Sequence, residues 1–255
     1  MDREIDLKDI SDGKFYGIND MVKADCQGCE GCSACCRGMG NSILLDPLDI
    51  FRLTSHLDCS FQELLQERIQ LQVVDGVILP NLKMAGAKEA CTFLGEDGRC
   101  TIHPFRPGLC RLFPLGRCYE NGSFRYFLQT HECPRENKAK VKVKKWIDTP
   151  QVKQYEEFVT AWHYFLKDLQ RLLEETSPEE SGVGSRWKDS ENTQAGTEAS
   201  CKDGEREITP REKLRKKICM YVLEQFFVQP YRRNEDFYQQ FFQRLKEARQ
   251  YMGWG

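Results

Sequence analysis

A run of clustered cysteines lies near the start of the chain. Cys29, Cys32, Cys35 and Cys36 form the pattern C-x2-C-x2-C-C, and Cys26 stands three residues ahead of it. Five thiols within eleven residues are forced close together, and a turn that carries C-x2-C presents both sulfurs to one point. Short peptides hold tetrahedral zinc or an iron–sulfur cluster in this way. The run therefore predicts a metal or cluster site.

The spacing within the run favours one kind of centre. Cys26-x2-Cys29-x2-Cys32-x3-Cys36 reproduces the ferredoxin-type spacing of a 4Fe–4S site, although Arg37 stands where a proline usually follows. A ferredoxin would also repeat the run, and this chain does not repeat it. The spacing therefore favours an iron–sulfur cluster, 4Fe–4S in type, over Zn²⁺, without indicating a ferredoxin.

A second group of cysteines follows: Cys91, Cys100, Cys110, Cys118 and Cys133. None of them forms a C-x2-C pair, so the two-knuckle pattern of zinc ribbons and RING domains does not fit. Arginines lie close to both groups, at Arg37, Arg106 and Arg111. Four thiolates on a divalent cation leave net negative charge, which nearby guanidinium groups would offset. Ordinary surface ion pairing is the alternative for Arg106 and Arg111.

Residues 29–133 resemble the YkgJ-like CxxCxxCC cysteine-cluster family, whose members are described as zinc- or iron-chelating. The resemblance is carried by the following motifs: Cys29-x2-Cys32-x2-Cys35-Cys36, Asp46-x-x-Asp49-Ile-x-Arg-Leu53, Cys91-x-Phe-Leu, Cys100-x-Ile, Arg106-Pro-x-x-Cys110-Arg-x-Phe-Pro114 and Cys133-Pro134. It implies eight metal ligands: Cys29, Cys32, Cys35, Cys36, Cys91, Cys100, Cys110 and Cys133. Cys26 and Cys118 fall outside the family pattern, and His103 stands where the family commonly has Tyr, which argues against a ligand role.

Three classes of function follow from these patterns. The first is a redox or catalytic iron–sulfur protein, favoured if part of the site is open to solvent. The second comes from flagellin lysine methylases, which carry a similar cysteine module, and would require a pocket for S-adenosylmethionine. The chain has neither a glycine-rich nucleotide loop nor the C-x3-C-x2-C spacing of radical enzymes that use this cofactor. The third is a non-catalytic, zinc-stabilised interaction module, favoured if every ligand is buried. The sequence leaves open whether the protein is an enzyme.

Local signals predict the elements that position these cysteines. Asp46-Pro47 and Ser60 are typical helix starts, and Asp75-Gly76 between β-branched residues indicates a tight hairpin. Short strands and turns are expected over about 73–133. Beyond them, three amphipathic helices are expected to begin at Thr149-Pro150, Thr209-Pro210 and Asn234.

The predicted fold class is α+β. An irregular, cysteine-rich, metal-stapled module with short strands spans residues 20–136, and an α-helical subdomain spans residues 146–253. Residues 176–207 are rich in Ser, Gly, Glu and Thr without periodicity, which predicts a mobile excursion within the helical part. The basic run Lys138–Lys145 is interpreted as a solvated connector.

Composition bounds the partners and the compartment. A net charge of -2 provides no general electrostatic reason to bind nucleic acid or an anionic membrane. No apolar stretch approaches the roughly 20 residues of a membrane span, and residues 1–6 lack the apolar core of a signal peptide. We therefore expect a cytoplasmic protein whose 13 cysteines stay reduced, with an unidentified protein or small molecule as its partner.

Overall fold

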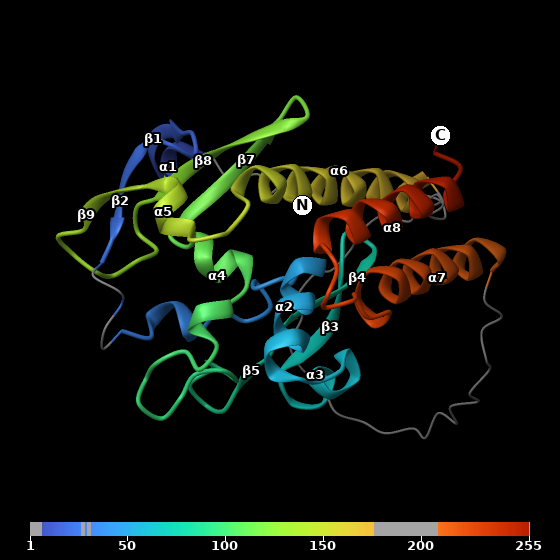
Figure 1. Cartoon of the computed structure of the whole chain (residues 1–255), viewed down its shortest axis with the longest axis horizontal. Helices are drawn as coiled ribbons and strands as arrows, with labels where there is room; N and C mark the ends of the chain where they lie inside the picture. Colours follow the sequence, from blue (N-terminus) through green and yellow to red (C-terminus); the bar gives the residue numbers. More distant parts are fainter. Residues whose placement is uncertain (1–6, 27–28, 30–31, 176–208, 255) are drawn as a thin grey trace, which may run out of the picture.

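The computed structural model describes residues 7–26, 29, 32–175 and 209–254, and it has an α+β fold (Figure 1). The helical elements are α1 (Leu7–Ile10), η2 (Ala34–Cys36), α2 (Pro47–Leu57), α3 (Phe61–Glu67), η3 (His103–Phe105), α4 (Gly108–Leu112), α5 (Val143–Ile147), α6 (Val152–Glu175), α7 (Pro210–Leu223), η4 (Glu224–Val228) and α8 (Phe237–Tyr251). The strands are β1 (Ser11–Tyr16), β2 (Met21–Asp25), β3 (Ile69–Val74), β4 (Val77–Leu82), β5 (Met84–Ala85), β6 (Ala90–Cys91), β7 (Leu115–Glu120), β8 (Ser123–Gln129) and β9 (Ala139–Lys142). The excursion predicted at 176–207 lies outside the described residues.

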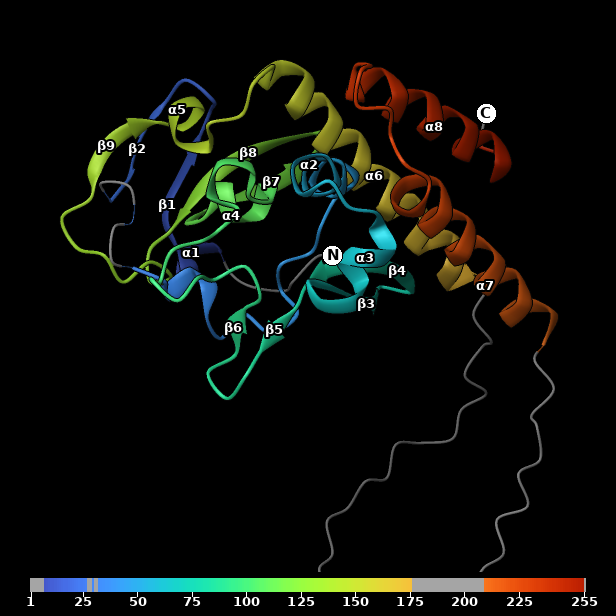
Figure 2. The same cartoon turned by 60° about the horizontal axis from the view of Figure 1, so that its bottom comes forward.

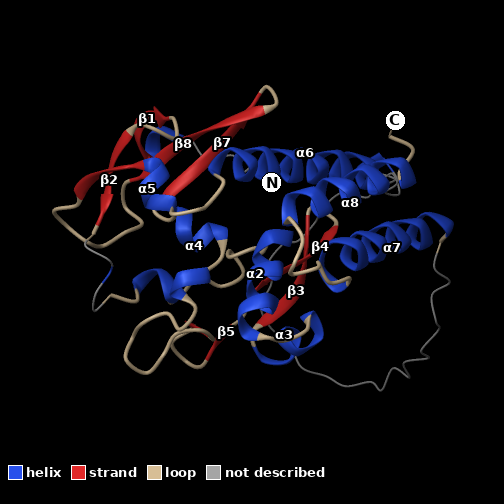
Figure 3. Ribbon diagram, in the orientation of Figure 1, coloured by secondary structure: helices blue, strands red, loops and turns tan. Residues whose placement is uncertain are grey.

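The described strands pair antiparallel in small sheets. A three-stranded sheet has the order β1-β8-β7, and the other strands form the pairs β2-β9, β3-β4 and β5-β6. Figure 3 shows β1, β2, β7 and β8 at one end of the molecule and helices α7 and α8 at the other. Strands β1 and β2 pair with β8 and β9, which lie more than 100 residues later in the chain. Backbone pairing with the middle of the chain therefore holds residues 11–25 in place.

Two predicted helix starts and the predicted hairpin turn are confirmed. Asp46 and Asp49 form a capping box at the start of α2, and Ser60 and Glu63 form one at α3. The hairpin between β3 and β4 turns at Asp75 and Gly76, whose φ angles of 49° and 82° are the positive values that a type I′ turn needs.

Two sequence predictions are corrected by the structure. The basic run is not a solvated connector, because it forms β9 and α5 and buries Val141 and Val143 between exposed lysines. The last helix is not capped by Asn234: the side chain of Asp236 accepts a hydrogen bond from the backbone N–H of Gln239 at 2.9 Å. Polar side chains within reach of a free N–H compete for the cap, and geometry decides between them.

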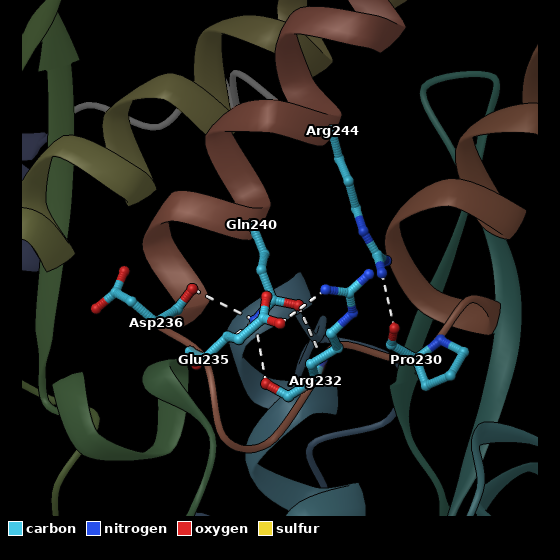
Figure 4. Close-up of polar contacts among 6 residues, drawn as sticks. All are labelled: Pro230, Arg232, Glu235, Asp236, Gln240 and Arg244. Carbon is cyan, nitrogen blue, oxygen red and sulfur yellow. Dashed lines mark hydrogen bonds and ion pairs between the residues drawn. The ribbon is translucent and has the colours of Figure 1, made fainter.

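The loop before α8 is held by side chains of that helix (Figure 4). Arg244 donates to the carbonyls of Gln225, Gln229 and Pro230, each at 2.7 Å, and Gln240 accepts a hydrogen bond from the backbone N–H of Arg232 at 2.8 Å. These bonds satisfy carbonyls where η4, a π-helical turn, ends. They fix α8 against the end of the preceding helix.

One hydrophobic core runs through both predicted regions. Phe158 and Trp162 of α6 pack against Phe241 of α8 with ring centroids 4.6 and 6.2 Å apart, and Trp162 also contacts Phe226 at 5.0 Å. The same buried cluster continues through α2, α3 and the β3-β4 hairpin, and Figure 2 shows these elements beside α6 and α7. Phe158, Trp162, Phe226 and Phe241 are therefore core residues, whereas Tyr251 at the end of α8 is exposed. No helix among the described residues has the length and apolar character needed to cross a membrane.

Candidate metal centre

Nine cysteines from both sequence groups line a single cavity of about 90 Å³. They are Cys26, Cys29, Cys32, Cys35, Cys36, Cys91, Cys100, Cys110 and Cys133. The set contains all eight ligands implied by the family resemblance, together with Cys26. Cys118 lies on β7 and does not line the cavity. Every cysteine among the described residues is a free thiol, so the two groups meet without disulfides.

Short, well-anchored elements bring these thiols together. Cys26 follows β2, Cys35 and Cys36 lie in the short helix η2, Cys91 ends β6, and Cys110 lies in α4. The described residues contain no group of three or more Cys, His, Asp or Glu side chains already arranged around one metal ion. The thiols therefore converge on a common cavity, while their assignment as ligands stays a prediction.

Helix α4 is positioned by a contact with α2. The backbone N–H of Gly108, two residues before Cys110, donates to Oδ1 of Asp49 at 2.7 Å. Trp146 of α5 donates its indole N–H to the carbonyl of Phe113 at 3.1 Å. Both bonds fix the backbone on either side of the Cys110 thiol, and Trp146 itself lines the cavity.

Two thiol pairs are in direct contact at the cavity. The sulfurs of Cys26 and Cys29 are 3.1 Å apart. Burial, followed by the hydrogen bond with Cys26, raises the pKa of the Cys29 thiol to about 12. A hydrogen bond with Cys36, followed by burial, raises the pKa of Cys35. Cys29 and Cys35 therefore hold their protons at neutral pH, so binding of a metal cation to them must release protons.

Three thiols of the second group also have raised pKa values. Burial raises the pKa of Cys91, Cys100 and Cys110, most strongly at Cys110, and a thiolate at Cys35, where it forms, raises each of the three pKa values further. Cys35 has the same effect on the pKa of Cys29, so it lies within electrostatic reach of thiols from both groups.

Three arginines, Arg99, Arg106 and Arg135, are among the residues that line the cavity, and none of its described lining residues is Asp or Glu. Arg106 contacts Nε2 of His103, and its positive charge opposes the rise in pKa at Cys29, Cys35 and Cys100. Burial, followed by the charge of Arg106, lowers the pKa of His103, which keeps that ring neutral. The cavity is thus suited to excess negative charge.

The three arginines that lie near the cysteines in sequence have different positions in the structure. Arg106 lines the cavity, whereas Arg111 is buried and donates to the carbonyls of Arg106, Asp148 and Pro104, so it holds the loop together. Arg37 is exposed and donates to Oγ of Ser33 at 3.2 Å.

Sequence reasoning missed the charges of Arg99 and Arg135. Their signal was present, because Arg99 directly precedes Cys100 and Arg135 follows Cys133 by two residues.

A second cavity, of about 410 Å³, adjoins the first. Cys35 and Cys110 line both cavities, together with Ile43 and Phe113. Its wall also contains polar residues, Ser42, Gln129 and Glu132 among them. Cys35 and Cys110 can therefore be reached from the second cavity, which the other seven cysteines do not line.

The donor set fits zinc or iron–sulfur chemistry. Soft thiolates select Zn²⁺ and iron–sulfur clusters, whereas Mg²⁺ and Ca²⁺ take oxygen ligands. The described cavity lining supplies thiols and no carboxylates.

Comparison with known families agrees with this chemistry. Residues 28–154 match the model of the CxxCxxCC family, described as a putative zinc- or iron-chelating domain. This region of the chain therefore belongs to the CxxCxxCC family. A search of curated proteins and a search of solved structures each found no match.

Proposed function

We propose that the protein binds an iron–sulfur cluster through thiols of the cavity described above. The observation that carries the proposal is the convergence of nine cysteines, from positions 26–36 and 91–133, on one cavity that also contains three arginines. The family description, zinc- or iron-chelating, supports a metal-binding role of this kind.

Charge and spacing favour iron–sulfur over zinc. A thiolate-bound cluster carries net negative charge, and Arg99, Arg106 and Arg135 lie where they would offset it. The run from Cys26 to Cys36 has the spacing of a 4Fe–4S site. When bound, such a cluster supplies one-electron transfer or a Lewis-acidic iron. The chain's own residues hold the thiolates, balance their charge and exclude water with the apolar wall that includes Trp146 and Phe113.

A redox or catalytic role is the second step of the proposal. The adjoining cavity supports it, because Cys35 and Cys110 line that cavity. Its volume of about 410 Å³ falls within the roughly 300–1,000 Å³ of small-molecule sites. The thiol cavity itself, at about 90 Å³, is smaller than such sites and lends no support to binding of S-adenosylmethionine beside the thiols. A zinc-stabilised interaction module is the outcome that metal analysis would favour if iron is not found.

The free thiols also support a reducing compartment, and we propose the cytoplasm. The partner, a protein or a small molecule, is a further prediction that the thiol cavity does not specify.

A comparison of two cysteine variants tests the binding role. Cys110→Ser removes a thiol that lines the cavity, and Cys118→Ser removes one that does not. After anaerobic reconstitution with iron and sulfide, we expect Cys118→Ser to keep the visible absorption of the wild type and Cys110→Ser to lose most of it. Equal absorption in both variants, or none in the wild type, would contradict the proposal.

A further inference from the structure

Strands β2 and β9 form a two-stranded ribbon whose two faces differ in character. Successive residues of a strand point to opposite faces, and residues directly opposite each other share a face. Val22 lies opposite Val141, and both are buried, so their face belongs to the core. On the other face Lys23 lies opposite Lys140, and both lysines are exposed. The outer face of the ribbon is therefore basic.

The exposed lysines continue along the ribbon and into α5. Met21 lies opposite Lys142, and both are exposed. Helix α5 begins directly after β9, contacts both strands and exposes two further lysines. Figure 2 shows β2, β9 and α5 together, at the end of the molecule away from α7 and α8. We call this surface the lysine patch, and its members are Lys23, Lys140, Lys142, Lys144 and Lys145.

Fold stability does not account for the lysine patch. Like charges directly opposite each other on antiparallel strands are destabilising, as with Lys23 and Lys140. None of the ion pairs among the described residues involves a lysine of the patch. Asp20, in the turn before β2, accepts a backbone N–H of that turn at 2.7 Å, and Asp148, after α5, pairs with Arg111 at 3.8 Å. The positive charge of the patch is therefore available to a partner.

The patch is opposite in sign to the rest of the chain. The net charge of the whole chain is -2, and the five lysines contribute five positive charges, so the remaining residues carry -7. A nucleic acid or an anionic membrane extends beyond so small a patch and would meet this negative charge. A compact acidic protein contacts only the area where the two surfaces have opposite sign. The charge distribution therefore favours an acidic protein over an extended polyanion.

The patch borders the thiol cavity at one end of the ribbon. Strand β2 pairs with β9 up to Asp25 opposite Ala139, and Cys26 is the next residue after β2. Lys138, which directly precedes β9, donates its ammonium group to the carbonyl of Cys133 at 3.1 Å. Cys26 and Cys133 both line the cavity. A protein seated on the patch would therefore lie beside the proposed centre.

We propose that the lysine patch docks a small acidic electron-carrier protein, which donates one electron to the iron–sulfur centre and is itself oxidised by one electron. This inference rests on the proposed iron–sulfur function and names the kind of partner that serves the same centre. Electron-transfer complexes bury little surface, and opposite charges steer the two proteins together. Exposed lysines beside one exposed apolar side chain, Met21, suit a contact of this kind.

Stopped-flow reduction of the cluster-loaded, full-length protein tests the docking. A reduced, acidic ferredoxin of the plant type serves as the electron carrier. The rate constant should fall as salt is added, because salt screens the attraction between opposite charges. At low salt, the patch variant should react at least about tenfold more slowly than the wild type, as expected when charge steering is lost. This variant combines Lys23→Gln, Lys140→Gln and Lys142→Gln.

A matched control variant loses the same number of charges at the other end of the molecule. It combines substitutions of exposed lysines in α7 and α8: Lys213→Gln, Lys216→Gln and Lys246→Gln. Because its net charge equals that of the patch variant, only the position of the lost charge differs, and it should keep most of the wild-type rate. Dithionite, a small reductant that needs no docking protein, should reduce the cluster to the same extent in all three proteins. The patch variant should melt no lower than the wild type, because it removes a like-charge pair.

The outcomes separate this inference from the proposed function. A cluster-loaded wild type that reacts no faster than the patch variant would overturn the inference and leave the iron–sulfur function intact. A wild type without a cluster would contradict the proposed function and the electron transfer with it. Calorimetric titration with oxidised ferredoxin needs no cluster, and binding should be weakened in the patch variant alone. Binding of a DNA duplex or of phosphatidylserine vesicles through the same lysines, without binding of ferredoxin, would overturn the assignment to an acidic protein.

Discussion

The carboxylate of Asp49 and the backbone of Gly108 meet although they are 59 residues apart: Oδ1 of Asp49 accepts the Gly108 N–H at 2.7 Å. A Cβ atom at Gly108 would lie 2.9 Å from the hydroxyl of Tyr155 on α6, which explains a glycine at this position. The contact joins α2, α6 and the start of α4, and so determines where the Cys110 thiol lies.

Removal of this carboxylate should destabilise the protein. Asp49→Ala leaves the buried N–H of Gly108 without an acceptor, which costs about 1–3 kcal/mol in free energy of unfolding. Urea denaturation measures this loss. Glu120→Ala is the control, because the Glu120 side chain makes an exposed ion pair with Arg125, at 3.5 Å, and its loss should cost less than about 1 kcal/mol. Equal losses in the two variants would show that the Asp49 contact is not a stabilising one.

Asp46 should make stability depend on pH. Burial, followed by the charge of Asp49, raises the pKa of Asp46 from 3.8 to about 8. Between these values the folded protein keeps a proton that the unfolded chain releases, so the free energy of unfolding should fall as pH rises through this window, by at most about 1.4 kcal/mol per pH unit. Denaturation of the wild type and Asp46→Asn from pH 5 to 7.5 measures this. Asn can still cap α2, and its profile should be flatter. Parallel profiles would contradict a raised pKa.

How far the sequence predicts the fold depends on whether the interactions are local. The capping boxes at Asp46 and Ser60 and the turn at Asp75-Gly76 involve residues close in sequence, so their patterns predict them correctly. The pairing of β2 with β9 joins Val22 to Val141, and no local pattern specifies that distance. The alternation of valine and lysine around Val141 is itself typical of a strand. The positive charge of the lysines instead favoured the interpretation of this run as a solvated connector.

The same distinction applies to the site. Cysteine spacing predicts which thiols meet, because chelating residues occur in short motifs. It predicts that Cys26 lies with Cys29, Cys32 and Cys36, but it does not predict that Cys118 lies away from the other cysteines of the second group, since this depends on the course of β7 in the folded chain. The loop-holding role of Arg111 depends on three carbonyls whose positions only the folded chain defines.

The three-stranded sheet contains one position where only glycine fits. Gly116 of β7 lies opposite Phe127 of β8, and a Cβ atom at Gly116 would overlap the phenyl ring. Gly116→Ala should therefore force the ring to move and lower the free energy of unfolding by about 1–3 kcal/mol. Gly17→Ala is the control, because its added Cβ atom meets only the Asp20 carboxylate at 3.4 Å. Thermal melts compare the two variants, and a Gly116→Ala melt as high as that of Gly17→Ala would contradict the overlap.

The charge of Arg106 should tune the proposed centre. Arg106→Gln removes positive charge beside the thiols, which favours the less negative, oxidised form of a cluster. The reduction potential should fall by on the order of tens of millivolts, as expected for a charge interaction at an effective dielectric constant near 20. Arg37→Gln is the control, because Arg37 is exposed and does not line the cavity. Anaerobic redox titration should show a lower potential for Arg106→Gln alone, and an equal shift in both variants would show that position at the cavity is irrelevant.

Metal and sulfide analysis of anaerobically purified protein tests the central claim most directly. With ample iron during expression, we expect a brown protein that contains iron and acid-labile sulfide in similar amounts and loses its colour in air. With two cluster centres, the iron content should exceed about four atoms per chain. Stoichiometric zinc without iron or sulfide would contradict the iron–sulfur assignment and favour a structural, non-redox role, and protein without either metal would contradict the metal-binding account itself.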